Sequence, residues 1–189
     1  MNIGESCNLA VVCLVGRGMK LSDEQEFTAF VQDRGDALLR YARLLEPDPA
    51  AAEDVLQIAL MRVLRHWPRR LNAPEAYART AILNLVRDRA RRRHLIAVPT
   101  EVGKDTAGDG PGPIEGLLAR ERLERLLGSL PPRQRITVVL RVIEGLTEAE
   151  TAEALECSAG TVKSNLARGL DKLRVMLADP TFALEGMLE

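Results

Sequence analysis

Arginine is concentrated in one stretch of the sequence, from Arg62 to Arg93, in which Glu75 and Asp88 are the only acidic residues. Guanidinium groups bind phosphate oxygens through charged hydrogen bonds. Trp67 and Tyr77 lie in the same stretch, and aromatic rings can stack against unpaired bases. The combination favours a surface that holds a nucleic-acid backbone and accepts a base. The alternative is a charged helix face that contacts only water.

A second group of polar side chains, towards the end of the chain, has the chemical types that read DNA. Hydroxyl, amide and cationic groups reach both base edges and phosphates. If a helix starts at a serine, the free backbone N–H groups of its first turn can bind a phosphate. The candidate residues are Ser158, Thr161, Lys163, Ser164, Asn165 and Arg168, with Lys172 and Arg174 further along. A helical hairpin with a solvated basic face is the plainer alternative.

An acidic stretch precedes the arginine-rich one. It contains Glu46, Asp48, Glu53 and Asp54, and no Lys or Arg lies between Leu44 and Met61. The whole chain has 26 Lys and Arg against 27 Asp and Glu, so a nearly neutral total hides two faces of opposite sign. Such an acidic face is suited to docking on a basic protein surface.

The sequence patterns around these groups are typical of helices throughout, so we expect an all-α fold. Aromatic residues make up only 3% of the chain, whereas strands are enriched in them. Ser22 with Gln25 predicts a first helix that ends at Glu46–Pro47, and Asp48 with Pro49 predicts the start of a second. The apolar stripe of that second helix is Ala52, Val55, Ala59, Val63 and Trp67.

A third helix is expected to start at Asn72–Glu75, with Glu75 returning a hydrogen bond to the cap, and to run to Arg93. Residues 99–116 are acidic and rich in Gly and Pro, which predicts a flexible linker. Helices resume at 114–128, and another starts at Pro131–Pro132 and stops at Gly145. The sequence therefore predicts two helical domains joined by the linker.

The last part of the chain has the pattern of a helix-turn-helix. Thr147 and Glu150 form a capping-box pattern for a short helix that ends near Leu155, in which Ala152 supplies the small residue at the helix crossing. Ser158 is expected to cap the recognition helix. The apolar face of that helix comprises Val162, Leu166, Leu170, Leu173 and Leu177. Glu156 stands where such a turn usually has glycine.

Several classes of function are not favoured by the composition. The longest apolar run, Leu9–Val15, is too short to span a membrane, and we expect no fold for residues 1–19. Both histidines, His66 and His94, lie among arginines, so we expect neither an enzyme nor a metal site nor a cofactor. Cys7 and Cys13 would bind metal only with further partners, and Cys157 is expected to pack in the turn. We expect a cytoplasmic protein.

In the order of these parts, the sequence resembles the extracytoplasmic-function (group 4) sigma factors of bacterial RNA polymerase. Asp48–Gln57 is similar to region 2.2 of that family, and Ala76–Arg79, Asn84–Asp88 and Arg91–Arg93 are similar to regions 2.3 and 2.4. Leu130–Arg135, Gly160–Ser164 and Arg168–Leu170 resemble region 4. Glu156 (often Gly) and Asn165 (often Arg) depart from the usual pattern of the family.

The resemblance implies a role for each group of residues. Glu53, Asp54 and Gln57 would bind the clamp helices of the largest subunit of core RNA polymerase. The −10 element of promoter DNA would be melted and read by Asn72, Tyr77, Asn84, Arg87, Arg91 and Arg92. Ser158, Thr161, Lys163, Ser164, Asn165 and Arg168 would read the −35 element. The polymerase flap and an anti-sigma factor are implied as further partners.

The resemblance also implies the domain organisation: region 2 at 20–98, the linker at 99–116, region 4 at 117–180 and a tail at 181–189. The implied function is that of an alternative sigma factor that binds core polymerase and directs promoter-specific initiation. Two other classes stay open from the residues themselves. One is a self-sufficient helix-turn-helix regulator that binds DNA without polymerase, and the other is a helical bundle that mainly contacts proteins.

Overall fold

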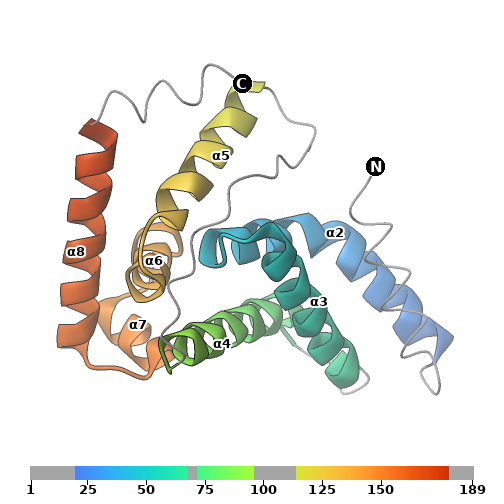
Figure 1. Ribbon diagram of the computed structural model, residues 1–189. Helices are drawn as coiled ribbons and strands as arrows, with labels where there is room; N and C mark the ends of the chain where they lie inside the picture. Colours follow the sequence, from blue (N-terminus) through green and yellow to red (C-terminus); the bar gives the residue numbers. More distant parts are fainter. Residues whose placement is uncertain (1–19, 68–71, 96–113, 179–189) are drawn as a thin grey trace. The chain divides into compact units, whose positions relative to one another are not determined.

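The structure, a computed structural model, describes residues 20–67, 72–95 and 114–178, and its regular elements there are all helices (Figure 1). The expected all-α fold is therefore confirmed. The chain divides into two compact units, Met1–Arg89 and Ala90–Glu189. The expected N-terminal extension, most of the linker, the C-terminal tail and Cys7 and Cys13 lie outside the described residues. No helix within the described ranges is long and apolar enough to cross a membrane.

The first unit begins with α2, Leu21–Leu45. The prediction that Ser22 caps this helix is wrong, because the carbonyl of Lys20 already accepts hydrogen bonds from the N–H groups of Asp23 and Glu24. Ser22 thus lies inside the first turn. The expected end at Glu46–Pro47 is confirmed, since Glu46 follows the last helical residue and has an extended backbone.

Helix α3 spans Pro49–His66 and starts as the sequence predicts. Oδ1 of Asp48 accepts hydrogen bonds from the N–H groups of Ala50 at 3.1 Å and Ala51 at 3.4 Å. The expected stripe is buried at Ala52, Val55, Ala59 and Val63. Trp67 instead ends the helix half-buried, with its ring 5.4 Å from that of Phe27.

Helix α4 spans Pro74–Leu95, and its part up to Arg89 completes this unit. Its first turn is marked by the Tyr77 N–H, which donates to the Ala73 carbonyl at 3.0 Å. The carboxylate of Glu75 pairs with Arg34 of α2 and with Arg79, each at 3.4 Å, and so ties α4 to α2. Side chains from all three helices form the core; the largest fully buried apolar ones are Phe27, Leu38, Leu45, Val55, Leu60, Val63, Ile82 and Val86.

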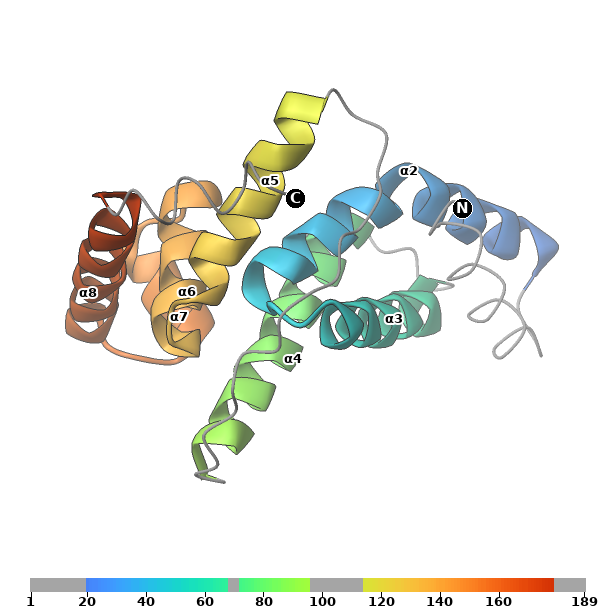
Figure 2. The same cartoon turned by 45° about the horizontal axis from the view of Figure 1, so that its top comes forward.

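The second unit contains α5 (Ile114–Gly128), α6 (Pro132–Val138), the π-helix η2 (Val139–Ile143), α7 (Glu148–Leu155) and α8 (Ala159–Ala178). Helix α8 runs alongside α6 and α7 (Figures 1 and 2). The buried Leu126, Leu127 and Leu130 around the end of α5 join Ile136, Val138, Val139 and Leu140 in the core of this unit.

The segment after Pro132 differs from the single regular helix that the sequence predicts. Its second half is a π-helix, closed by a hydrogen bond from the Glu144 N–H to the Val139 carbonyl at 3.0 Å. Gly145 then adopts a φ of +70°, and the Leu146 N–H donates to the Leu140 carbonyl at 3.0 Å. This is the left-handed helix end that glycine permits, so the expected stop at Gly145 is confirmed.

The helix-turn-helix forms much as the sequence predicts. Thr147 and Glu150 make the full capping box: the Thr147 N–H donates to Glu150 Oε2 at 2.7 Å, and the Glu150 N–H donates to Thr147 Oγ1 at 3.2 Å. Glu156 has a φ of 51° and a ψ of 48°, which confirms the left-handed turn position. Ala152 is half-buried, whereas its neighbour Thr151 is fully buried.

The apolar face of α8 is only partly as expected. Val162 is buried and Leu166, Leu170 and Leu173 are half-buried. Leu177, predicted for the same face, is 54% exposed near the end of the described helix. Ser158 caps α8 as expected, with its Oγ accepting a hydrogen bond from the Thr161 N–H at 3.1 Å.

Candidate nucleic-acid interface

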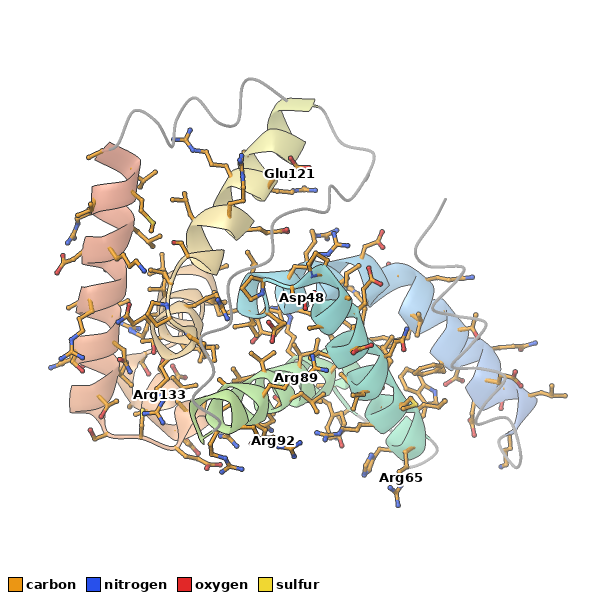
Figure 3. All side chains as sticks on the ribbon, in the orientation of Figure 1. Asp48, Arg65, Arg89, Arg92, Glu121 and Arg133 are labelled. Atoms are coloured by element: carbon orange, nitrogen blue, oxygen red, sulfur yellow. The ribbon has the colours of Figure 1, made fainter. Side chains whose placement is uncertain are left out.

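Helix α3 has an acidic end and a basic end. Asp48 and Arg65 mark these two ends in Figure 3. The expected polymerase-binding residues Glu53, Asp54 and Gln57 are all exposed on its N-terminal half. A cation is favourable near the C-terminus of a helix, where the backbone dipole is negative, and the exposed Arg65 lies there.

The two carboxylates of the acidic half have intramolecular partners. Glu53 lies 3.6 Å from Arg43 of α2, and Asp54 lies 3.5 Å from Arg89 of α4. These pairs remain accessible, since the side chains of Glu53 and Asp54 are 48% and 65% exposed. The acidic half of α3 is therefore bordered by arginines from both neighbouring helices.

The expected −10 residues lie along α4 and just before it. Asn72 is exposed ahead of the helix, Asn84 and Arg87 are half-buried along it, and Arg91 and Arg92 are exposed towards its C-terminal end. These polar and basic groups therefore all come from α4 and the residues just ahead of it. Arg93 and His94 lie on the same helix, but their side chains are outside the described part.

Tyr77 contacts the end of α3 through His66, which is not among the residues that the sequence predicts for the site. The Tyr77 hydroxyl lies 3.2 Å from Nδ1 of His66, and the same nitrogen lies 2.8 Å from the carbonyl oxygen of Arg62. The Tyr77 hydroxyl and the Arg62 carbonyl thus meet at the same ring nitrogen of His66. No sequence spacing links His66 to Tyr77, because they lie on different helices.

Two arginines of the basic stretch are committed to contacts within the unit. The guanidinium of Arg79 lies over the ring of Tyr41, with Cζ 4.8 Å from its centre, and pairs with Glu75. Arg89 is bound to α3. The structure therefore shows that Arg79 and Arg89 stabilise the unit through these contacts. The sequence alone does not distinguish them from the exposed arginines.

On the recognition helix α8, two of the expected DNA-reading residues are exposed and three are half-buried. Lys163 and Arg168 are exposed, whereas Thr161, Ser164 and Asn165 are half-buried. Ser164 donates its hydroxyl hydrogen to the Thr161 carbonyl at 3.0 Å, which leaves the lone pairs of the hydroxyl to accept from a base edge.

Lys172 and Arg174, which the sequence adds to this surface, contact protein groups instead. The ammonium of Lys172 donates to the Ser129 carbonyl at 2.8 Å, at the end of α5. The guanidinium of Arg174 pairs with Asp171 at 2.6 Å. Lys172 therefore contributes to the placement of α8 on the second unit.

A glycine fixes the close approach of α8 to α6. A Cβ atom on Gly169 would stand 2.8 Å from Cγ2 of Val138, which is closer than such carbons approach. The sequence gives little indication of this role, because Gly169 is a single small residue within an otherwise ordinary helix. Helix α8 therefore packs closely against α6 where Gly169 meets Val138.

Both units match known families. Residues 30–95 match the family described as Sigma-70 region 2, and residues 120–173 match Sigma-70, region 4. The RNA polymerase sigma-E factor of Streptomyces avermitilis is 44% identical over 153 residues, covering 79% of this chain and 83% of the relative. The chain belongs to the sigma-70 family. The described helices α3 and α4 lie wholly within the region 2 match.

Two further relatives place the sigma factor within the family. The RNA polymerase sigma-E factor of Streptomyces coelicolor is 44% identical over 153 residues, covering 79% of this chain and 84% of the relative. The ECF RNA polymerase sigma factor SigM of Mycobacterium tuberculosis is 31% identical over 159 residues, covering 82% of the chain and 79% of the relative. The chain is an extracytoplasmic-function sigma factor.

Proposed function

We propose that this alternative sigma factor binds core RNA polymerase through the acidic half of α3, reads the −10 element with α4 and reads the −35 element with α8. Family membership carries the general function, which is to direct transcription initiation with core polymerase on promoter DNA. The finer assignment rests on the separation of charge between α3 and α4. The domain limits 20–98, 99–116, 117–180 and 181–189 belong to this proposal.

The proposed contact with the polymerase clamp helices uses Glu53, Asp54 and Gln57. Their exposure on adjoining turns of one helix supports this assignment, because carboxylates steer association with a basic surface. For the flap we propose the second unit. Val142 and Ile143 are neighbours on η2 and are 59% and 41% exposed, and adjacent exposed apolar side chains are suited to a protein contact.

For the −10 element we propose Asn72, Tyr77, Asn84, Arg87, Arg91 and Arg92. Opening about 10 base pairs removes stacking of about 1.4 kcal/mol per step. A captured base and several phosphate contacts must offset that cost together with the polymerase. The exposure of Arg91 and Arg92 supports phosphate contacts, and the polar groups nearer the start of α4 support capture of a flipped base.

For the −35 element we propose that α8 enters the major groove with Ser158, Thr161, Lys163, Ser164, Asn165 and Arg168. The Ser158 cap and the exposure of Lys163 and Arg168 support this role. We further propose that the protein acts in the cytoplasm without a cofactor, and that an anti-sigma factor holds it inactive. A self-sufficient regulator is not favoured, because it leaves the match to Sigma-70 region 2 without a purpose.

The decisive experiment is transcription in vitro from a pool of genomic fragments with core polymerase and the full chain. We expect run-off products only when both are present. A protein that protects an operator from cleavage without polymerase, and has no affinity for the core enzyme, would contradict the proposal.

A further inference from the structure

One arginine of the basic helix contacts helix α3 at two points. Nη1 of Arg89 donates to the carbonyl of Ala51 at 2.7 Å. Nη2 of the same guanidinium lies 3.5 Å from Oδ2 of Asp54. The Arg89 side chain is 31% exposed, whereas Asp54 is 65% exposed. Arg89 therefore reaches from α4 to the acidic half of α3, although about a third of its side chain stays exposed.

These contacts hold the first turn of α3 from two directions. Asp48 accepts the N–H of Ala51, and Arg89 donates to the carbonyl of the same residue. Hydrogen bonds that involve a charged group are about twice as strong as neutral ones. The first turn, directly ahead of Glu53 and Asp54, is thus held by a charged group at the N–H and another at the carbonyl of one residue, Ala51.

The neighbouring arginine on α4 behaves differently. Arg92 lies nearly one turn further along the helix and is exposed, and Figure 3 labels both residues on α4. The planar guanidinium of Arg89 can contact a carbonyl and a carboxylate at once, whereas a lysine ammonium is a compact point charge. Both arginines lie on α4 and carry the same charge, but Arg89 contacts Ala51 and Asp54 of α3 whereas Arg92 is exposed.

We propose that Arg89 is a positioning residue that couples the polymerase-binding turn of α3 to the DNA-binding helix α4, and that it does not contact DNA. This inference rests on the proposed function of the two helices. It predicts that loss of Arg89 affects binding of the core enzyme, even though the residue lies within the basic stretch. Asp54 then depends on Arg89 for its orientation towards the polymerase.

The test compares Arg89→Gln with Arg92→Gln in the full chain. Fluorescence anisotropy measures affinity for core polymerase, and a salt titration of open-complex formation counts phosphate contacts. We expect Arg89→Gln to weaken core binding about tenfold, on the order of one charged hydrogen bond, and to leave the salt slope unchanged. Arg92→Gln is expected to keep core affinity and to reduce the slope by about 0.9.

A double-mutant cycle separates positioning from general destabilisation. Asp54→Asn should weaken core binding in the wild type and have an effect at least about threefold smaller in Arg89→Gln, because interacting residues are not additive. Full additivity would overturn the proposal, as would a reduced salt slope in Arg89→Gln at any core affinity. A lower Tm with unchanged core affinity would also overturn it.

Arg89→Lys keeps the test decisive if Arg89→Gln does not fold. The lysine keeps the positive charge but loses the two-point contact, so core affinity should fall below the wild type while the salt slope is retained. Wild-type core affinity in Arg89→Lys would overturn the proposal. Failure of the unmodified chain to bind core polymerase is a separate result, which would remove the proposed function itself.

Discussion

Lys163 of the recognition helix lies 3.4 Å from Glu148, the first residue of α7. The side chain of Lys163 is 66% exposed, so in the proposed contact with the −35 element a DNA phosphate would compete with the carboxylate for the same ammonium. The carboxylate would also repel the DNA backbone. In the proposed complex, Glu148 of α7 would therefore oppose phosphate binding by Lys163 of α8.

The first prediction is that Glu148→Gln tightens binding of the holoenzyme to a promoter with a −35 element. We expect an increase of about threefold at low salt, since a screened surface pair contributes up to about 1 kcal/mol. Lys163→Ala should weaken binding. Glu153→Gln, an exposed change on the same helix, is the control; an equal gain there would show that general charge, not the pair, is responsible.

The second prediction concerns Gly169→Ala. The new Cβ would lie 2.8 Å from Cγ2 of the buried Val138, and a β-branched side chain cannot easily rotate away. Overpacking of about 1–3 kcal/mol exceeds the helix-propensity gain of about 1 kcal/mol. We expect a lower Tm, by roughly 4–8 °C per kcal/mol lost. Gly160→Ala is the control.

In that control, the nearest heavy atom to the new Cβ is Ser158 Oγ at 3.8 Å. This is an ordinary contact, so alanine should keep or raise the Tm of the unit. Equal destabilisation by both substitutions, in thermal unfolding followed by circular dichroism, would contradict the close-packing argument for Gly169.

The third prediction is that Glu156→Gly stabilises the second unit. Glu156 has a φ of 51°, a conformation that costs a residue with a side chain about 1–2 kcal/mol. After the extra entropy of glycine is counted, we expect a gain of about 0.5–1 kcal/mol in the free energy of unfolding. Glu153→Gly, inside α7, should instead lose about 1 kcal/mol. Urea unfolding of both variants decides the sign.

The fourth prediction concerns the capping box. The hydroxyl and the backbone N–H of Thr147 donate to the carboxylate of Glu150, and they lower the pKa of Glu150 from its ordinary value of 4.5. A lowered pKa in the folded state stabilises the fold above the unfolded pKa, and this contribution disappears as the pH falls through the folded pKa. Acidification should therefore unfold α7 more readily than neutral conditions do.

NMR titration of the Glu150 carboxyl measures that effect directly. In Thr147→Ala the hydroxyl is lost, so the Glu150 pKa should rise towards the ordinary value. In Glu150→Gln the stability should start lower at neutral pH and decline less on acidification through this window. An unchanged Glu150 pKa in Thr147→Ala would contradict the assigned cause.

The structural features that could be predicted were helix caps, which depend on residues close together in the sequence. The Asp48 cap with Pro49, the Thr147–Glu150 box and the Ser158 cap each involve residues within three positions of one another, and each is confirmed. Ser22 has the right chemistry for a cap, but the helix begins one residue ahead of it. Capping patterns in the sequence therefore predicted approximately where each helix starts, but not always which residue is the first helical one.

Features that depend on the fold were not predictable in this way. The contact of Arg89 with Ala51 joins residues 38 positions apart, and Tyr77 meets His66 across two helices. The distribution of charge in the sequence indicates a basic stretch. It does not indicate that Arg79 and Arg89 contact other residues of the first unit. The π-helix at Val139–Ile143 also has no signal in the apolar spacing of that segment.

That π-helix has a consequence for the length of the segment. A wider turn takes in one more residue than a regular one, and each residue turns a helix by about 100°. Gly145 consequently leaves the axis of α6 in a direction that depends on the surplus residue. The number of residues between Pro132 and Gly145 therefore helps to set the direction in which α7 starts.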